Sequence, residues 1–249
     1  MRLIVIGAGH AGVEAALASA RMGIETILLT MDEHRISIMN CNPSVGGPAK
    51  GIVVREIDAL GGQMGITADR TALQFKMLNT NKGPGVQCLR VQSDKVAYSQ
   101  MMDEVVHTTK NLTVKQGLAE KLLIEDGIAK GVLLQSGEIL DAQAVVLTSG
   151  TYMSSKILVG STATQSGPEG QPTTKDLSQS LRDAGLKTFR LKTGTPPRIK
   201  TNSIDFSQGV IQPGDSQFIH FSLDFPESAY PKDQVPCYLI YTQPKTHEV

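Results

Sequence analysis

The chain has 249 residues, 40% of them hydrophobic, which is enough to bury the core of one large or two modest domains. Its 24 basic residues balance 24 acidic ones, so net charge indicates neither a nucleic-acid nor a membrane partner, although a local basic patch stays open. Three cysteines far apart argue against a disulfide framework or a zinc site and favour a reducing cytoplasm. No apolar run reaches the length of a membrane span.

The first thirty residues have the pattern of a dinucleotide-binding unit. The apolar run Leu3–Ile6 predicts a buried parallel strand, and residues 7–12 follow it as a G-x-G-x-x-G turn. Apolar residues at helical spacing predict a helix over residues 13–20, and residues 26–29 predict a second parallel strand. The six residues of the turn are the predicted cofactor contacts: Gly7, Ala8, Gly9, His10, Ala11 and Gly12.

Each glycine of the turn has a separate physical reason. Gly7 permits the tight turn, Gly9 lets the backbone approach a pyrophosphate, and Gly12 lets the helix pack closely on the strand. The helix N-terminus offers N–H groups and a positive dipole end to the phosphates. The residue that binds the ribose is open, because Thr30 stands where an acid is expected and Asp32 and Glu33 lie just beyond it.

Residues 31–50 are predicted to form mainly a loop, because prolines and glycines crowd its second half. Cys41 lies in this loop. A free cysteine is most often a small buried hydrophobic residue, but an Asn/Pro/Gly loop close to a helix N-terminus also suits a nucleophile. The helix is expected to follow and to end at Gly61-Gly62. Its predicted inner face comprises Ile52, Val53, Ile57 and Leu60.

The loop and helix at residues 40–51 and 55–62 resemble the MnmG (GidA) flavoproteins, which modify the wobble uridine of transfer RNA. The resemblance covers nearly the whole chain. It continues through Met77-Leu78-Asn79, Lys82-Gly83-Pro84, residues 89–95, residues 191–198, Gln234–Tyr238 and Lys245-Thr246-His247. Departures occur at Gly85, Cys88, Ser149 and residues 153–155.

This resemblance implies an enzyme that adds an aminomethyl or carboxymethylaminomethyl group at C5 of the wobble uridine (U34) of tRNA. It implies FAD as the redox cofactor, NADH as reductant, methylenetetrahydrofolate as carbon donor and glycine or ammonium as amine source. The implied partner is the GTPase MnmE, joined to a homodimer of this protein in a cytoplasmic heterotetramer. Cys41 matches a family cysteine implicated in attack on uridine, whereas Cys88 and Cys237 are expected to be structural.

Residues 93–151 predict the remainder of a flavin domain. A helix is expected up to Thr108 with Tyr98, Met101, Met102 and Val105 inside, followed by a strand at 112–116. Three strands at 121–124, 128–134 and 139–141 form an antiparallel meander, and a last strand at 144–147 leads into Thr148-Ser149-Gly150-Thr151. This order resembles the FAD domain of glutathione-reductase-like flavoproteins and favours FAD over NAD. In that layout the backbone at Ala119 faces the adenine, and Thr174 aligns with a family flavin contact.

The rest of the chain is expected to contain a loop at 161–174, a helix at 175–184, a short strand at 188–191 and a rigid turn at 193–198. Lys192 and Arg198 would then lie near flavin or substrate, or form a structural bend. The predicted fold class is α/β, a glutathione-reductase-like FAD-binding Rossmann domain with a parallel sheet, a β-meander and the start of an inserted second domain.

The predicted domains are an incomplete FAD-binding domain at residues 1–200, lacking its closing strand, and the start of an inserted β-rich, NAD-binding domain at 201–249. The family's C-terminal helical domain is absent, so this chain alone is expected to bind FAD weakly and to be inactive.

Three rival functions have weaker support in the sequence. The folate- and FAD-dependent tRNA 5-methyluridine methyltransferase TrmFO shares the fold and opening motif, but its cysteine loop differs. A pyridine-nucleotide disulfide reductase needs a redox dithiol soon after the first unit, and the sequence has none there. The third alternative is a non-catalytic dinucleotide-binding module that has kept the fold and lost the chemistry.

Overall fold

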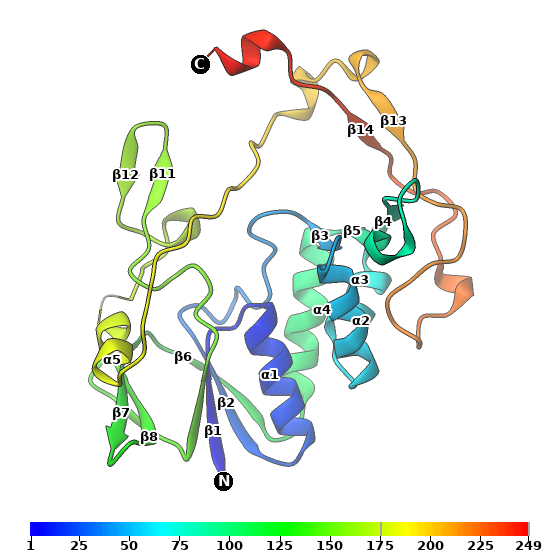
Figure 1. Ribbon diagram of the computed structural model, residues 1–249. Coiled ribbons are helices and arrows are strands. Elements are labelled where there is room, and N and C mark those ends of the chain that lie inside the picture. The colour runs from blue at the N-terminus through cyan, green and yellow to red at the C-terminus, as the bar shows by residue number, and fades with distance from the viewer. Residues whose placement is uncertain (175, 249) are drawn as a thin grey trace. The chain divides into compact units, whose positions relative to one another are not determined.

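The computed structural model describes residues 1–174 and 176–248, which form two compact units (Figure 1). The first unit comprises Met1–Asn40, Gly61–Met64 and Lys95–Thr193, and the second comprises Cys41–Leu60, Gly65–Asp94 and Gly194–Val249. The chain therefore passes between the units several times. The domain boundary near residue 200 that the sequence indicates stays a prediction.

The first unit is built on a parallel sheet with strand order β10-β1-β2-β6. Its strands are β1 (Arg2–Ile6), β2 (Glu25–Thr30), β6 (Leu112–Gln116) and β10 (Ala144–Leu147). The four strands predicted from the sequence are confirmed. All of β1 except its first residue is buried, as expected for a parallel strand covered on both faces.

Two helices, α1 (His10–Arg21) and α4 (Lys95–Thr108), cover one face of this sheet (Figure 1). In α1 the buried positions after Gly12 are 13, 16, 17 and 20, which is the predicted helical spacing. The prediction for α4 was partly wrong. The structure buries Tyr98, Met102 and Val106 at intervals of one helical turn and leaves Met101 and Val105 half-buried.

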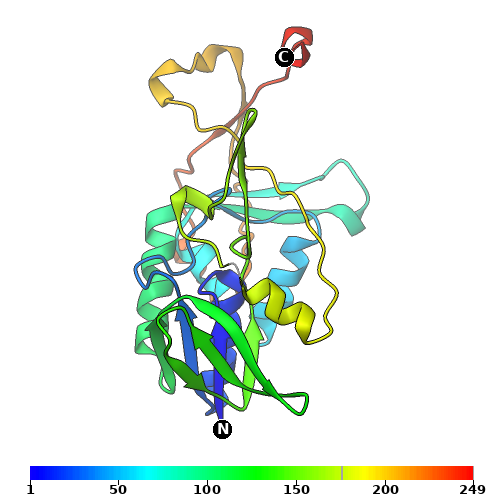
Figure 2. The ribbon, with the colours of Figure 1, turned by 90° about the vertical axis from the view of Figure 1, so that its left-hand side faces the viewer.

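An antiparallel meander covers the other face of the sheet (Figure 2). It consists of β7 (Ala119–Glu125), β8 (Ile128–Leu134) and β9 (Ile139–Asp141), as predicted. Helix α5 (Leu177–Asp183) packs beside the meander, and its Leu177 joins the core. That core joins Ile4, Ile6 and Leu29 of the parallel sheet to Ala119, Val132, Leu134 and Ala142 of the meander segment. The fold class predicted from the sequence is confirmed.

Three local predictions in the first unit need correction. The predicted loop at 161–174 contains β12 (Thr162–Thr164), which pairs with β11 (Ile157–Val159) in a hairpin. The predicted helix at 175–184 is α5, and Lys175 lies outside the described residues. The predicted strand at 188–191 is absent from the described chain, because this apolar segment is exposed and pairs with no strand edge.

The second unit contains helices α2 (Lys50–Ala59) and, apart from its first residue, α3 (Met64–Arg70). Its sheet has the order β3-β5-β4, formed by β3 (Ser44–Gly46), β4 (Ala72–Leu78) and β5 (Cys88–Ser93). A separate pair joins β13 (Val210–Gln212) to β14 (Cys237–Leu239). Short 3₁₀ turns lie at Pro84–Val86, Pro168–Gly170, Thr201–Ser203, Phe206–Gln208, Glu227–Ala229 and Pro244–His247.

One prediction for the second unit was incomplete and another was wrong. The loop predicted at 31–50 includes strand β3, which forms because β5 offers it a pairing edge. Helix α2 turns a different face inward from the one predicted: Gly51 and Val54 are buried, whereas Leu60 is 90% exposed. The helix approaches β5 so closely that a Cβ on Gly51 would lie 2.9 Å from the carbonyl oxygen of Leu89. Throughout residues 1–174 and 176–248, no helix has the length and apolarity needed to cross a bilayer.

Candidate functional site

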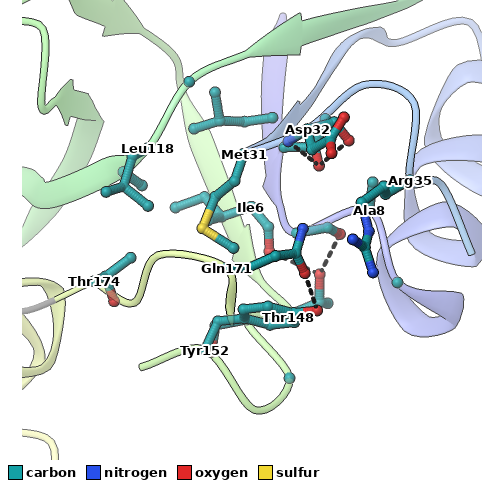
Figure 3. Close-up of a pocket in the computed structure, with 18 of the residues that line it drawn as sticks. Ile6, Ala8, Met31, Asp32, Arg35, Leu118, Thr148, Tyr152, Gln171 and Thr174 are labelled. Carbon is teal, nitrogen blue, oxygen red and sulfur yellow. Dashed lines mark hydrogen bonds between the residues drawn. The ribbon is translucent and has the colours of Figure 1, made fainter. Parts of the chain in front are cut away.

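A pocket opens in the first unit where the four parallel strands end (Figure 3). Its wall includes residues 7–9 after β1, 31–32 after β2, 117–119 after β6 and 148–150 after β10. Ligands of open α/β sheets bind beyond the carboxyl ends of the strands, at the edge where this pocket lies. The topology therefore makes the pocket at the glycine turn the candidate binding site.

The glycine turn combines two tight approaches with one open position. Gly7 has φ +105°, and a Cβ there would lie 2.5 Å from the carbonyl oxygen of Thr148. A Cβ on Gly12 would lie 1.7 Å from the carbonyl oxygen of Gly7. A Cβ on Gly9, by contrast, would meet no atom within 4 Å. Gly7 and Gly12 are thus required by packing, whereas Gly9 leaves a backbone cradle open at the start of α1.

Backbone hydrogen bonds hold the ends of the strands around this cradle. The Gly7 N–H donates to the Leu29 carbonyl at 2.8 Å, and the Thr148 N–H donates to the Ile6 carbonyl at 2.9 Å. Thr148 Oγ1 lies 2.8 Å from the Ile6 carbonyl oxygen and 3.0 Å from that of Gly7. The first turn of α1 contains no acidic residue, so its N–H groups and dipole favour an anion.

The end of β2 supplies the polar groups nearest to the expected ribose position. Thr30 and Asp32 both line the pocket, and Glu33 is not among the described residues of its wall. Thr30 Oγ1 donates to the Asp32 carbonyl at 3.2 Å, while Asp32 Oδ1 accepts from the His34 N–H at 3.0 Å. The hydrogen bond from the His34 N–H fixes the Asp32 carboxylate at the pocket. There the carboxylate can accept hydrogen bonds from a diol.

The opposite wall carries a fixed aromatic hydroxyl. Tyr152 donates to Gln171 Oε1 at 2.8 Å and accepts from Asn40 Nδ2 at 3.3 Å. Burial raises the pKa of the Tyr152 phenol above its ordinary value, so the phenol stays protonated at neutral pH. Two hydrogen bonds therefore hold the Tyr152 ring in one orientation in the pocket wall (Figure 3).

Thr174 lines the pocket and carries a buried hydroxyl group that is unsatisfied among the described residues. Its Oγ1 is buried and has no hydrogen-bond partner in the part of the chain that the structure describes. Buried hydroxyl groups are nearly always paired, because an unpaired one costs about 1–3 kcal/mol. The Thr174 hydroxyl and the cradle at Gly9 both suit a polar, phosphate-bearing ligand, and the residues present fit a dinucleotide.

The predicted cofactor contacts divide into two groups. Five of them line the pocket: Gly7, Ala8, Gly9, Ala119 and Thr174. Gly12 shapes the turn from behind, and Ala11 is exposed. His10 begins α1 and packs its ring against Tyr98 at a centroid distance of 5.5 Å, where burial lowers its pKa and favours neutral imidazole. Neither His10 nor Ala11 is among the described residues of the pocket wall.

Three polar residues of the wall were not predicted from the sequence: Arg35, Tyr152 and Gln171. Arg35 and Gln171 lie in irregular segments without a recognisable motif. Tyr152 directly follows the predicted Thr-x-Gly-Thr turn, so its position in the sequence could have indicated that it lies near the pocket.

Cys41 belongs to the second unit and is exposed. Its Sγ lies 3.5 Å from the carbonyl oxygen of Gly194, and Arg198 Nη2 donates to the Cys41 carbonyl at 2.6 Å. The structure thus brings together two motifs that are far apart in the sequence. Cys88 is buried in β5, and Cys237 is partly buried, with Sγ 3.5 Å from Gln74 Oε1. Cys41 is the most accessible of the three thiols.

Comparison with known proteins gives one consistent result. Residues 2–249 match the family model described as glucose inhibited division protein A. The chain is 53% identical over 247 residues to the tRNA uridine 5-carboxymethylaminomethyl modification enzyme MnmG of Latilactobacillus sakei and 52% identical to that of Bacillus subtilis. In both comparisons 99% of this chain is aligned, and it spans 39% of the relative's length.

Solved structures agree with these matches. The structure of Aquifex aeolicus GidA superposes with a TM-score of 0.93 at 43% identity, covering 99% of this chain and 42% of that protein. The GidA-related protein from Thermus thermophilus has a TM-score of 0.54 at 19% identity, covering 74% of this chain and 68% of that one, and shares the fold.

Proposed function

Because this chain belongs to the family of glucose inhibited division protein A, we propose that it forms the FAD-binding part of an enzyme that modifies the wobble uridine (U34) of tRNA. The proposed modification is an aminomethyl or carboxymethylaminomethyl group at C5, and its relatives are named for the carboxymethylaminomethyl modification of tRNA uridine. One observation carries the proposal: the glycine turn lines a pocket in a chain more than half identical to those enzymes.

FAD is the proposed occupant of the pocket. The glycine turn and the start of α1 would hold its diphosphate, Asp32 its ribose and the backbone at Ala119 its adenine. The Thr174 hydroxyl would gain the hydrogen bond that it otherwise lacks. FAD supplies the redox chemistry when bound, with NADH as its reductant and methylenetetrahydrofolate as carbon donor, and the protein supplies binding and orientation.

Cys41 is the proposed nucleophile. Its thiolate would add to C6 of the uracil ring, which makes C5 electron-rich and able to attack the activated carbon; loss of the C5 proton then expels the thiolate. The exposed position of Cys41 supports this role, because the thiol must reach a base on a large RNA. Cys88 is excluded from the role by its burial.

The proposed partners are tRNA and the GTPase MnmE, with a homodimer of this protein in a heterotetramer in the cytoplasm. Residues 201–249 would begin an inserted domain that binds NADH. Both proposals rest on the family to which the chain belongs.

Nucleoside mass spectrometry of tRNA from cells that lack the complete protein tests the proposal. The aminomethyl-type wobble uridine should disappear while 5-methyluridine of the T loop is retained. The opposite pattern would assign the chain to the TrmFO-like methyltransferases. Unchanged levels of both nucleosides, in cells without a second copy of the gene, would contradict tRNA modification and favour a non-catalytic module.

A further inference from the structure

Arg35 lines the pocket beside the glycine turn, although no sequence motif identified it. It belongs to the loop after β2, and its N–H donates to the Asp32 carbonyl at 3.3 Å. Two residues later the Ser37 N–H donates to the Ala8 carbonyl at 2.8 Å, which ties this loop to the glycine turn. Figure 3 shows the Arg35 side chain next to Ala8.

Charge makes this position notable. Among the described residues that line the pocket, Arg35 is the one cation and Asp32 the one anion. The diphosphate of a dinucleotide carries two negative charges, and the start of α1 offers only backbone N–H groups and a partial dipole charge. A guanidinium presents a planar fork of donors that fits phosphate oxygens.

The Arg35 guanidinium is already bonded to another anion. Its Nη2 pairs with Glu169 Oε2, and Lys95 Nζ lies 3.9 Å from the other Glu169 oxygen. Glu169 sits in the turn Pro168–Gly170, two residues before Gln171 of the pocket wall. The Glu169 side chain is 51% exposed, so water solvates its carboxylate when the ion pair with Arg35 opens. Replacing Glu169 by another anion as the partner of Arg35 therefore costs little free energy.

We infer that Arg35 binds the diphosphate of the dinucleotide and that Glu169 competes with the ligand for its guanidinium. The inference rests on the proposed FAD site and adds a residue outside the glycine motif. Glu169 would make the pocket select ligands that carry a diphosphate, because only a diphosphate can replace the Glu169 carboxylate as the partner of the Arg35 guanidinium. Adenosine or riboflavin would gain nothing from Arg35.

Binding of ADP and adenosine to the flavin-free complete protein tests the inference, because these probes differ only by the diphosphate. Arg35→Gln should weaken ADP binding about tenfold and leave adenosine binding within about twofold. Glu169→Gln should tighten ADP binding, by about threefold, because it removes the competitor. The matched control is Lys95→Gln, which removes a cation paired with the same carboxylate but outside the pocket wall, and should leave both affinities within about twofold.

Thermal unfolding verifies that each variant folds. If Arg35→Gln does not fold, Arg35→Lys keeps the charge without the fork and should still lose several-fold in ADP affinity. Equal losses for ADP and adenosine, or an equal loss in Lys95→Gln, would overturn the role of Arg35. Weaker ADP binding by Glu169→Gln would overturn the competition. If the wild type binds FAD and Arg35→Gln retains full ADP affinity, only this inference is refuted. If the wild type binds neither FAD nor ADP, the proposed function is refuted as well.

Discussion

Gly12 approaches Gly7 so closely that a Cβ on Gly12 would lie 1.7 Å from the Gly7 carbonyl oxygen and 2.7 Å from Thr148 Oγ1. The first contact is with backbone, which cannot rotate away. The glycine turn is therefore held by packing between α1 and the ends of β1 and β10, even before a ligand is considered.

Gly12→Ala is expected to destabilise the first unit by about 3 kcal/mol or more, because either α1 or the turn must move. Denaturant unfolding measures the loss, and flavin binding should disappear with it. An unchanged unfolding midpoint would show that the turn accommodates a methyl group and would contradict this account of Gly12.

Gly9→Ala should have the opposite effect, with little change in stability but a loss of FAD affinity. Gly9 has φ −76°, which alanine adopts freely, and its added Cβ meets no atom within 4 Å. We expect the free energy of unfolding to change by no more than about 0.5 kcal/mol. FAD affinity should fall by at least about tenfold, because the methyl group occupies space next to the diphosphate. Full FAD affinity in a stable Gly9→Ala protein would place the diphosphate elsewhere.

The sequence predicted the elements that depend on local patterns. Segments of four or five residues marked all four parallel strands, and those at 3–6, 26–29 and 144–147 are mainly apolar. Asp126-Gly127 marked the first turn of the meander, where both residues have positive φ. The helical face of α2 was missed because it is set by a neighbour: Gly51 packs on Leu89 of β5, and no periodicity within α2 reveals this contact. Strand β3 likewise exists because β5 pairs with it.

The site residues that belong to a sequence motif could be predicted, whereas contacts between residues far apart in the sequence could not. The glycine turn was found from its spacing. Arg35 and Glu169 are 134 positions apart, and neither has a motif that points to the other. The contacts of Cys41 with Gly194 and Arg198 likewise span more than 150 positions. Only the fold brings such pairs together.

Thr174→Val removes a buried hydroxyl that has no hydrogen-bond partner among the described residues and keeps its shape. The stability of the flavin-free protein should therefore stay constant or rise slightly, whereas FAD affinity should fall about fivefold to tenfold. Fluorescence titration measures the affinity.

The matched control is Thr173→Val. Thr173 Oγ1 already donates to the Tyr152 carbonyl at 2.5 Å, so this variant should lose about 1 kcal/mol of stability. An unaltered FAD affinity in Thr174→Val would remove the hydroxyl from the site.

Asp69 should make stability depend on pH. Its side chain accepts N–H bonds from Phe221 and Ser222, yet burial dominates and raises its pKa from 3.8 to about 6. The folded chain thus holds a proton that the unfolded chain has released between these values. The free energy of unfolding should fall as pH rises from about 4 to about 6, by up to about 3 kcal/mol, and then level off.

Denaturant unfolding at a series of pH values checks this slope, which Asp69→Asn should abolish. Asp58→Asn removes a neighbouring carboxylate that accepts the Leu223 N–H at 3.3 Å, and it should retain most of the slope. The same pH dependence in Asp69→Asn and wild type would assign it to another group.

Cys41→Ser tests the proposed nucleophile, since a serine hydroxyl is a far weaker nucleophile than a thiolate at neutral pH. The complete protein with this change should bind FAD as the wild type does and reduce C5 modification of the wobble uridine at least about a hundredfold. Cys237→Ser is the control, because Cys237 is partly buried with Sγ 3.5 Å from Gln74 Oε1, and a hydroxyl can keep that hydrogen bond. Nucleoside mass spectrometry of tRNA from complemented cells measures both variants. Wild-type modification by Cys41→Ser, or equal losses in the two variants, would exclude Cys41 as the attacking group.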